Sequence, residues 1–181
     1  MEVTFQDKTI IPDLKKIPIP FGMGIWYGKL SNELDNTLID VIKGEQDAQR
    51  NFTNVKALMT TWNLSDKPGF DVLSQWVQAT ANTIGLCEFE VNLGSVVQDM
   101  WGMIYYKDNY ATLHSHWPAI ISGVYYPQAP EGSSSIVFPD VNVTITPETN
   151  DIIFFPGFLK HKVEANNDVE RISISWNIKQ Y

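Results

Sequence analysis

From residue 86 onward the chain consists of short β-rich runs separated by turn residues, and this pattern constrains the fold more than any other feature. The runs include "ATLHSH", "IISGVYY", "DIIFFP" and "ERISISWNI", and the segments between them include "KDN", "QAPEGS", "PETND" and "NND". Such alternation is typical of strands joined by tight turns. With about eight strands and no intervening helix, residues 86–181 are predicted to form an all-β sandwich or barrel of the jelly-roll type.

The first 85 residues are predicted to support this β core. "KKIPIPFGMGIWYGKL" reads as an extended segment ending in a strand, because Pro18 and Pro20 exclude a helix. A helix is expected after an N-cap at Ser31, since five apolar residues recur at helical spacing: Leu34, Leu38, Ile39, Val41 and Ile42. A second helix should run from about Gly69 to a stop at Gly85. We expect both helices to pack on the outside of one sheet, within a single domain spanning residues 1–181.

Charge and composition exclude several functional classes. The net charge of −8 and pI of about 4.7 disfavour nucleic acid as a partner, because an acidic surface repels phosphate. No apolar run approaches the ~20 residues that span a bilayer, and the N-terminus lacks a signal pattern, so a cytoplasmic protein is expected. Cys87 is the single cysteine, which rules out an intrachain disulfide, and we expect it to pack in the core after a helix.

The three histidines of the chain are candidate metal ligands. His114 and His116 are spaced by two residues, so on a strand they point to the same face. His161 follows 45 residues after His116 (161 − 116 = 45), far enough to lie across a barrel from the pair. Imidazoles bind Fe, Zn, Cu and Ni, and three protein ligands leave positions open for substrate. The alternative is a chance pair on a solvent-facing strand.

"RISIS" suggests an anion-binding strand. Arg171 and Ser173 share one face, and an arginine pointing inward requires an anionic partner. A guanidinium with a hydroxyl two residues along can bind a carboxylate. In the alternative arrangement Arg171 faces solvent, and the core face of the strand is formed by Ile172, Ile174 and Trp176.

Taken together, "LHSH", "ISGVYY", "GFLKH" and "ERISISWN" resemble the 2-oxoglutarate- and Fe(II)-dependent oxygenases. The resemblance is greatest to the prolyl-hydroxylase-like subset found in bacteria and their phages. It covers residues 90–181 strongly and the preceding region more loosely. It implies a mainly β protein with the double-stranded β-helix (jelly-roll) fold and supporting N-terminal helices.

The resemblance also implies roles for individual residues. Arg171 and Ser173 match the pair that grips the distal carboxylate of 2-oxoglutarate, and Tyr126 and Tyr105 are two candidates for a further contact with this cosubstrate. Iron would be held by residues matching the usual ligand triad, which here are His114, His116 and His161.

His116 departs from the family pattern, in which an aspartate occupies its position. Three neutral imidazoles could hold iron by themselves. Alternatively Asp140 or Asp99 could complete the triad, with His116 supporting a ligand from outside the coordination sphere. A halide could instead bind where the carboxylate is missing, but this normally requires a small residue at the position. Because histidine is large, we do not expect a halide here.

The function implied is an Fe(II)- and 2-oxoglutarate-dependent dioxygenase that uses O2, releases succinate and hydroxylates a protein, peptide or small molecule. Trp62, Trp101 and Trp117 are expected to be exposed and could flank the substrate cleft. Two alternatives stay open at this point. One is a non-catalytic jelly roll that binds a ligand through its tryptophans, and the other is a cupin-like three-histidine dioxygenase that does not use 2-oxoglutarate.

Overall fold

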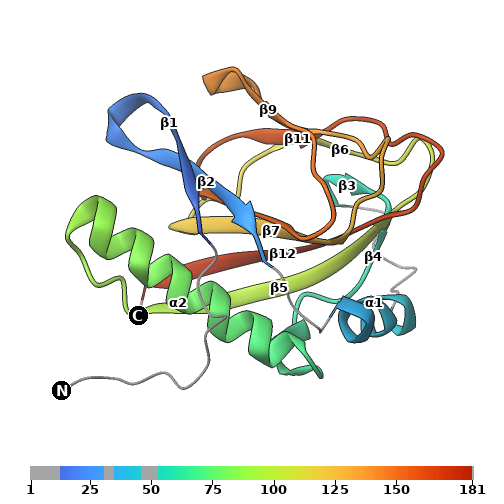
Figure 1. Ribbon diagram of the computed structural model, residues 1–181, viewed down its shortest axis with the longest axis horizontal. Coiled ribbons are helices and arrows are strands. Elements are labelled where there is room, and N and C mark those ends of the chain that lie inside the picture. Colours follow the sequence, from blue (N-terminus) through green and yellow to red (C-terminus); the bar gives the residue numbers. More distant parts are fainter. Residues whose placement is uncertain (1–12, 31–34, 46–52, 181) are drawn as a thin grey trace.

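The computed structural model describes residues 13–30, 35–45 and 53–180, which form two antiparallel sheets and two α-helices (Figure 1). The larger sheet has seven strands in the order β1-β2-β10-β7-β12-β5-β4. In this order the strands span Lys15–Pro18 (β1), Gly24–Lys29 (β2), Asp151–Pro156 (β10), Ile121–Gln128 (β7), Arg171–Gln180 (β12), Ser95–Tyr105 (β5) and Leu58–Met59 (β4).

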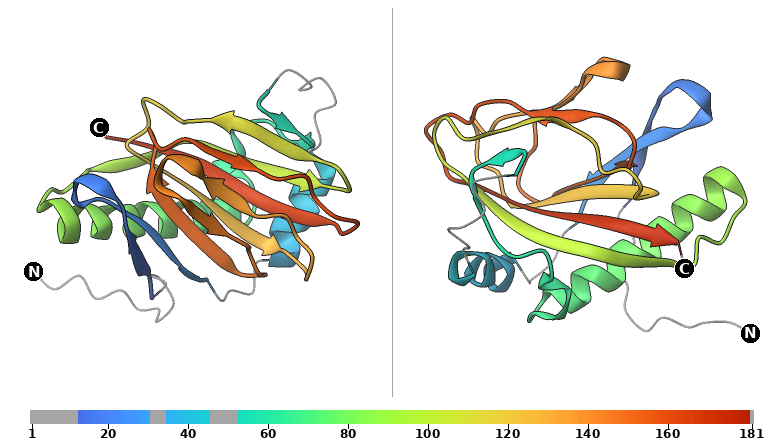
Figure 2. Two further views of the ribbon diagram at one scale, coloured as in Figure 1. Left: turned by 90° about the horizontal axis from the view of Figure 1, so that it is seen from above. Right: turned by 180° about the vertical axis from the view of Figure 1, so that it is seen from behind.

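The smaller sheet has five strands in the order β3-β6-β11-β8-β9 and lies over the larger one (Figures 1 and 2). In this order the strands span Val55–Lys56 (β3), Tyr110–His114 (β6), His161–Val163 (β11), Ile136–Phe138 (β8) and Val143–Ile145 (β9). From β5 to β8 consecutive strands alternate between the two sheets, with β5 and β7 in the larger sheet and β6 and β8 in the smaller, and the same alternation recurs from β9 to β12. The prediction of a mainly β jelly roll is confirmed.

Both helices cover the outer face of the larger sheet (Figure 1), as the sequence predicted. Helix α1 spans Asp35–Gly44 and contacts β5 and β7, while α2 spans Phe70–Phe89 and contacts β5. The helices and sheet share one apolar core, in which Leu38, Leu73 and Trp176 are fully buried. The expected N-cap Ser31 and the first apolar position Leu34 lie outside the described residues. None of the described helices is both long and apolar enough to cross a bilayer.

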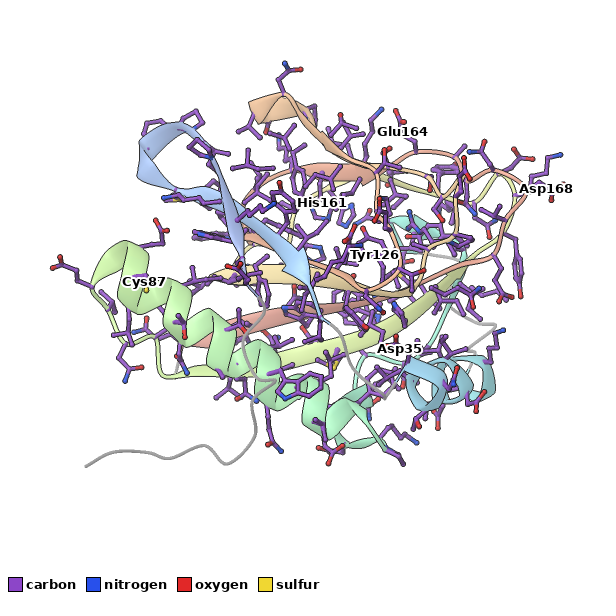
Figure 3. All side chains as sticks on the ribbon, viewed as in Figure 1. Asp35, Cys87, Tyr126, His161, Glu164 and Asp168 are labelled. Carbon is purple, nitrogen blue, oxygen red and sulfur yellow. The ribbon has the colours of Figure 1, made fainter. Side chains whose placement is uncertain are left out.

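Two expectations about the end of the second helix are wrong. Helix α2 continues past Gly85 and ends at Phe89, with Glu90 as a left-handed C-cap. Gly85 is needed for close packing, because a Cβ there would lie 2.6 Å from the Leu93 side chain, which folds back over the helix. Cys87 is therefore inside the last helical turns, and its side chain is exposed (Figure 3).

The first 85 residues also contribute strands. The hairpin β1–β2 extends the larger sheet through pairing of β2 with β10, and β3 and β4 pair with β6 and β5. Whether the chain behaves as one domain stays a prediction. The arrangement places the inner faces of the two sheets opposite each other, and the candidate site lies between them.

Candidate metal centre

The strand pairing of the smaller sheet brings two distant histidines together. His114 is the last residue of β6, His161 is the first residue of β11, and these two are direct partners in the antiparallel register. The potential ligand nitrogens of His114, His116 and His161 all lie within 4.8 Å of one another. His161 extends from the smaller sheet toward the larger one, where Tyr126 lies on β7 (Figure 3). The predicted convergence of the three histidines is thus present in the fold.

His116 reaches the cluster differently from the way the sequence suggested. Strand β6 ends at His114, so His116 lies in the loop that follows and not on the strand. Its backbone N–H donates to the carbonyl oxygen of Gly157 at 2.7 Å, and its own carbonyl accepts from Ala119 at 2.8 Å. The two loops approach so closely that a Cβ at Gly157 would lie 2.1 Å from the Ala119 oxygen. This close packing holds the imidazole Nε2 of His116 3.3 Å from that of His161.

The environment keeps the imidazoles neutral, which is the form that binds metals. Burial lowers the pKa of all three, and for His116, which is also close to His114, the pKa falls to about 4. The Nδ1 atoms of His114 and His161 lie 2.7 and 3.2 Å from the carbonyl oxygens of Thr112 and Leu159. With a proton on each Nδ1 donated to these oxygens, the Nε2 lone pairs are left for a metal.

No carboxylate joins the three histidines in the part of the chain that the structure describes. Asp140 is exposed in the short 3-10 helix Pro139–Val141. Asp99 is half-buried on β5 and accepts a hydrogen bond from Asn177 at 3.2 Å. The geometry therefore does not support the alternative in which one of these acids completes the triad.

Arg171 and Ser173 face the same space from the larger sheet. Arg171 is 1% exposed and Ser173 is equally buried, so the alternative of a solvent-facing arginine is wrong. The Nη1 atom of Arg171 donates to the carbonyl oxygen and to the Oγ of Ser134, at 2.8 and 2.9 Å. Its Nε and the Ser173 Oγ have no partner among the described residues. Ser134, in the run "GSSS", gave no recognisable signal in the sequence.

The two predicted tyrosines stack around the guanidinium. The Arg171 Cζ lies 4.0 Å from the ring centre of Tyr105 and 5.5 Å from that of Tyr126. Burial raises the pKa of both phenols, so both stay protonated at neutral pH and can donate hydrogen bonds. Tyr105 directs its hydroxyl toward the sulfur of Met103 at 3.6 Å.

All seven predicted site residues line one cavity between the sheets. The cavity wall also contains Trp101, whose indole Nε1 has no acceptor among the described residues. The remaining wall is apolar or small: Val55, Met103, Ala111, Val124, Ile136, Phe155, Val163 and Ser175.

The three tryptophans expected to flank a cleft have different positions. Trp101 is 6% exposed, so the expectation of an exposed residue is wrong, and its ring lies 5.7 Å from that of His116. Trp62 is half-exposed and packs against Trp101 at 5.8 Å. Trp117 is exposed and borders a separate apolar pocket with Phe158.

Comparison with known proteins supports the fold. No family model matches the sequence, and no curated protein does. Among solved structures, the viral collagen prolyl hydroxylase of Paramecium bursaria Chlorella virus-1, determined with 2-oxoglutarate, is 18% identical with a TM-score of 0.65, covering 86% of this chain and 96% of that one. A Pseudomonas putida prolyl-4-hydroxylase is 16% identical with a TM-score of 0.68, covering 88% and 94%.

A third solved structure is HygX from Streptomyces hygroscopicus, determined with nickel and 2-oxoglutarate bound. It is 10% identical with a TM-score of 0.67, covering 88% of this chain and 84% of that one. At these identities the likeness establishes the fold. The chain has the double-stranded β-helix of the 2-oxoglutarate- and Fe(II)-dependent oxygenases, as the sequence resemblance implied.

Proposed function

We propose that this protein is an Fe(II)- and 2-oxoglutarate-dependent dioxygenase that hydroxylates a protein, peptide or small-molecule substrate. The observation that carries the proposal is the composition of one cavity. Three neutral imidazoles converge on one side, and a buried arginine and serine with unpaired polar atoms face them from the other. The single cysteine, and the Fe(II) that this site would hold, suit a reducing cytoplasm.

The residues present fit both groups. Imidazole nitrogens are good ligands for Fe(II), and three of them leave coordination positions for a chelating cosubstrate and O2. Arg171 is a buried cation without a carboxylate partner in the described chain, which is costly unless an anion binds there. A carboxylate of 2-oxoglutarate would accept from Arg171 Nε and Ser173 Oγ, which otherwise have no partner.

The chain's own residues bind, orient and exclude water. When bound, Fe(II) and 2-oxoglutarate supply the oxidising chemistry, in which O2 is consumed, 2-oxoglutarate is decarboxylated to succinate and a substrate C–H bond is hydroxylated. Arg171 would neutralise the distal carboxylate of 2-oxoglutarate, and Ser134 fixes the plane of the Arg171 guanidinium by accepting two hydrogen bonds. Tyr105 and Tyr126 cover the guanidinium with their rings and shield it from water.

The third ligand distinguishes this site from the usual triad. Because His116 replaces a carboxylate, the protein contributes no negative charge to the metal. The neutralising charge would then have to come from the dianionic cosubstrate, so we expect metal and 2-oxoglutarate to bind with strong mutual dependence. A cupin-like dioxygenase without 2-oxoglutarate shares the histidines, but it gives no reason for the buried, unpaired atoms of Arg171 and Ser173.

A thermal-shift series tests the proposal. We expect Mn(II), used in place of Fe(II), to raise the melting temperature, and 2-oxoglutarate to raise it further only when metal is present. Arg171→Ala should keep the metal effect and lose the 2-oxoglutarate effect, while His116→Ala should lose both. With Fe(II) and O2, the wild type should form succinate above the Arg171→Ala background. Stabilisation by metal that is indifferent to 2-oxoglutarate would favour the cupin-like alternative, and no metal effect would favour the ligand-binding jelly roll.

A further inference from the structure

The inner face of the larger sheet carries a polar row beside the metal centre that the proposed chemistry does not use. The row consists of Ser122, Asn177 and Asp99 on β7, β12 and β5, and it starts beside Phe155 of β10. Phe155 pairs with Ser122, Ser122 with Asn177, and Asn177 with Asp99. The row begins next to the candidate metal site, because the Phe155 ring lies 6.2 Å from that of His116. It ends in a carboxylate.

Hydrogen bonds hold this carboxylate in place. The hydroxyl of Ser122 donates to Asn177 Oδ1 at 2.9 Å, and Asn177 Nδ2 donates to Asp99 Oδ2 at 3.2 Å. Asp99 is half-buried, and no described lysine, arginine or histidine lies within ion-pair distance of it. A partly buried carboxylate with one amide donor retains capacity to accept from a cation.

Trp101 connects Asp99 to the cavity. The two residues lie on the same face of β5, two positions apart, which corresponds to roughly 7 Å along the strand. Trp101 is almost wholly buried in the cavity wall, beside His116, and its Nε1 has no acceptor among the described residues. Together with the half-exposed ring of Trp62, it forms an aromatic surface leading from the metal site toward solvent.

This geometry points to the class of substrate. An aromatic surface favours an aliphatic chain and a cation, and an unbranched stem of about four carbons spans a length similar to the separation of Trp101 and Asp99. The net charge of −8 adds a long-range attraction for cations. We propose that the substrate carries a primary amine on an aliphatic chain, as a lysine side chain does, and that Asp99 binds its ammonium group while Trp101 lines the path of the chain. The inference rests on the proposed oxygenase function.

A pair of probes that differ by one ammonium group tests this. Nα-acetyl-lysine N-methylamide and Nα-acetyl-norleucine N-methylamide are titrated calorimetrically into protein loaded with Mn(II) and 2-oxoglutarate. We expect the lysine probe to bind about tenfold tighter, which corresponds to one charge-assisted hydrogen bond. Its affinity should fall with rising salt, while that of the norleucine probe should not. Equal affinity for the two probes would overturn the inference.

Variants locate the effect. Asp99→Asn keeps the shape of the side chain and should reduce the lysine preference to near unity. Asp140→Asn removes the same charge from the exposed 3-10 helix and should leave the preference intact. A preference that survives in Asp99→Asn would contradict the assignment to Asp99. Mn(II) binding is measured separately by electron paramagnetic resonance. If Mn(II) does not bind, the proposed metal site is wrong, whereas equal affinity of the two probes with Mn(II) bound contradicts only the substrate inference. The two probes can also be compared on the metal-free protein.

Discussion

The two faces of strand β12 have opposite character, although their residues alternate along one chain segment. Toward the helices, Ile172, Ile174 and Trp176 are fully buried in the main apolar core. Toward the smaller sheet, Arg171 and Ser173 are equally buried but lack partners for some of their polar atoms. Burial alone therefore does not distinguish core from site.

The difference between the faces is one of hydrogen-bond satisfaction. Apolar side chains on the helix side gain stability from burial, whereas buried donors without acceptors on the other side cost stability in the ligand-free protein. We interpret the inner face as a surface whose polar groups are satisfied only when ligands bind. Substitutions on neighbouring residues of β12 should thus affect stability and ligand binding separately.

The largest expected effect is on the helix side. Ile174→Ala should lower the free energy of unfolding by about 2–5 kcal/mol, because it leaves a cavity in a closely packed core. The affinity for 2-oxoglutarate, measured by calorimetry at a temperature where the variant is folded, should stay close to that of the wild type. A loss of affinity as large as the loss of stability would show that the two faces are not separable.

Its neighbour Ser173 should behave in the opposite way. Ser173→Ala removes a buried hydroxyl without a partner, so the unfolding free energy of the ligand-free protein should be unchanged or slightly higher. The affinity for 2-oxoglutarate in the presence of Mn(II) should fall about tenfold, through loss of one hydrogen bond to a carboxylate. Urea denaturation and calorimetry measure the two quantities. A clear destabilisation with unchanged affinity would assign Ser173 to the core.

A third expected effect is a pH dependence of stability that belongs to the site face alone. The three histidines have a pKa below 6.5 in the folded protein, about 4 for His116, so between these values the unfolded chain binds more protons. The metal-free protein should therefore be most stable above pH ~6.5 and lose stability as the pH falls toward ~4. Urea denaturation at pH 7.5 and 5.0 measures this.

Matched variants sharpen the pH test. His116→Gln should reduce the difference in unfolding free energy between the two pH values, because one of the shifted groups is removed. Ile174→Ala should lower stability equally at both. If His116→Gln left the pH dependence unchanged, the shifted pKa of His116 would not contribute to it.

Much of the fold followed from local patterns. Turn residues between short apolar runs predicted the strands after residue 86, and helical periodicity predicted both helices, because these signals depend on neighbours in sequence. The end of α2 could not be predicted, since Gly85 reads as a C-cap until the packing of Leu93 against it is known. The burial of Trp101 and the exposure of Cys87 likewise depend on which face of an element meets the core.

The residue types of the candidate site could be read from the sequence: three histidines, an arginine and a serine on one strand face, and two tyrosines. In the structure all seven line one cavity. Their arrangement in space depends on the tertiary fold. The register of β6 against β11 places His114 opposite His161, the contact with Gly157 turns His116 toward them, and the second sheet buries Arg171. These are contacts between residues far apart in the chain, and their geometry is set by the packing of two sheets, which no local pattern encodes.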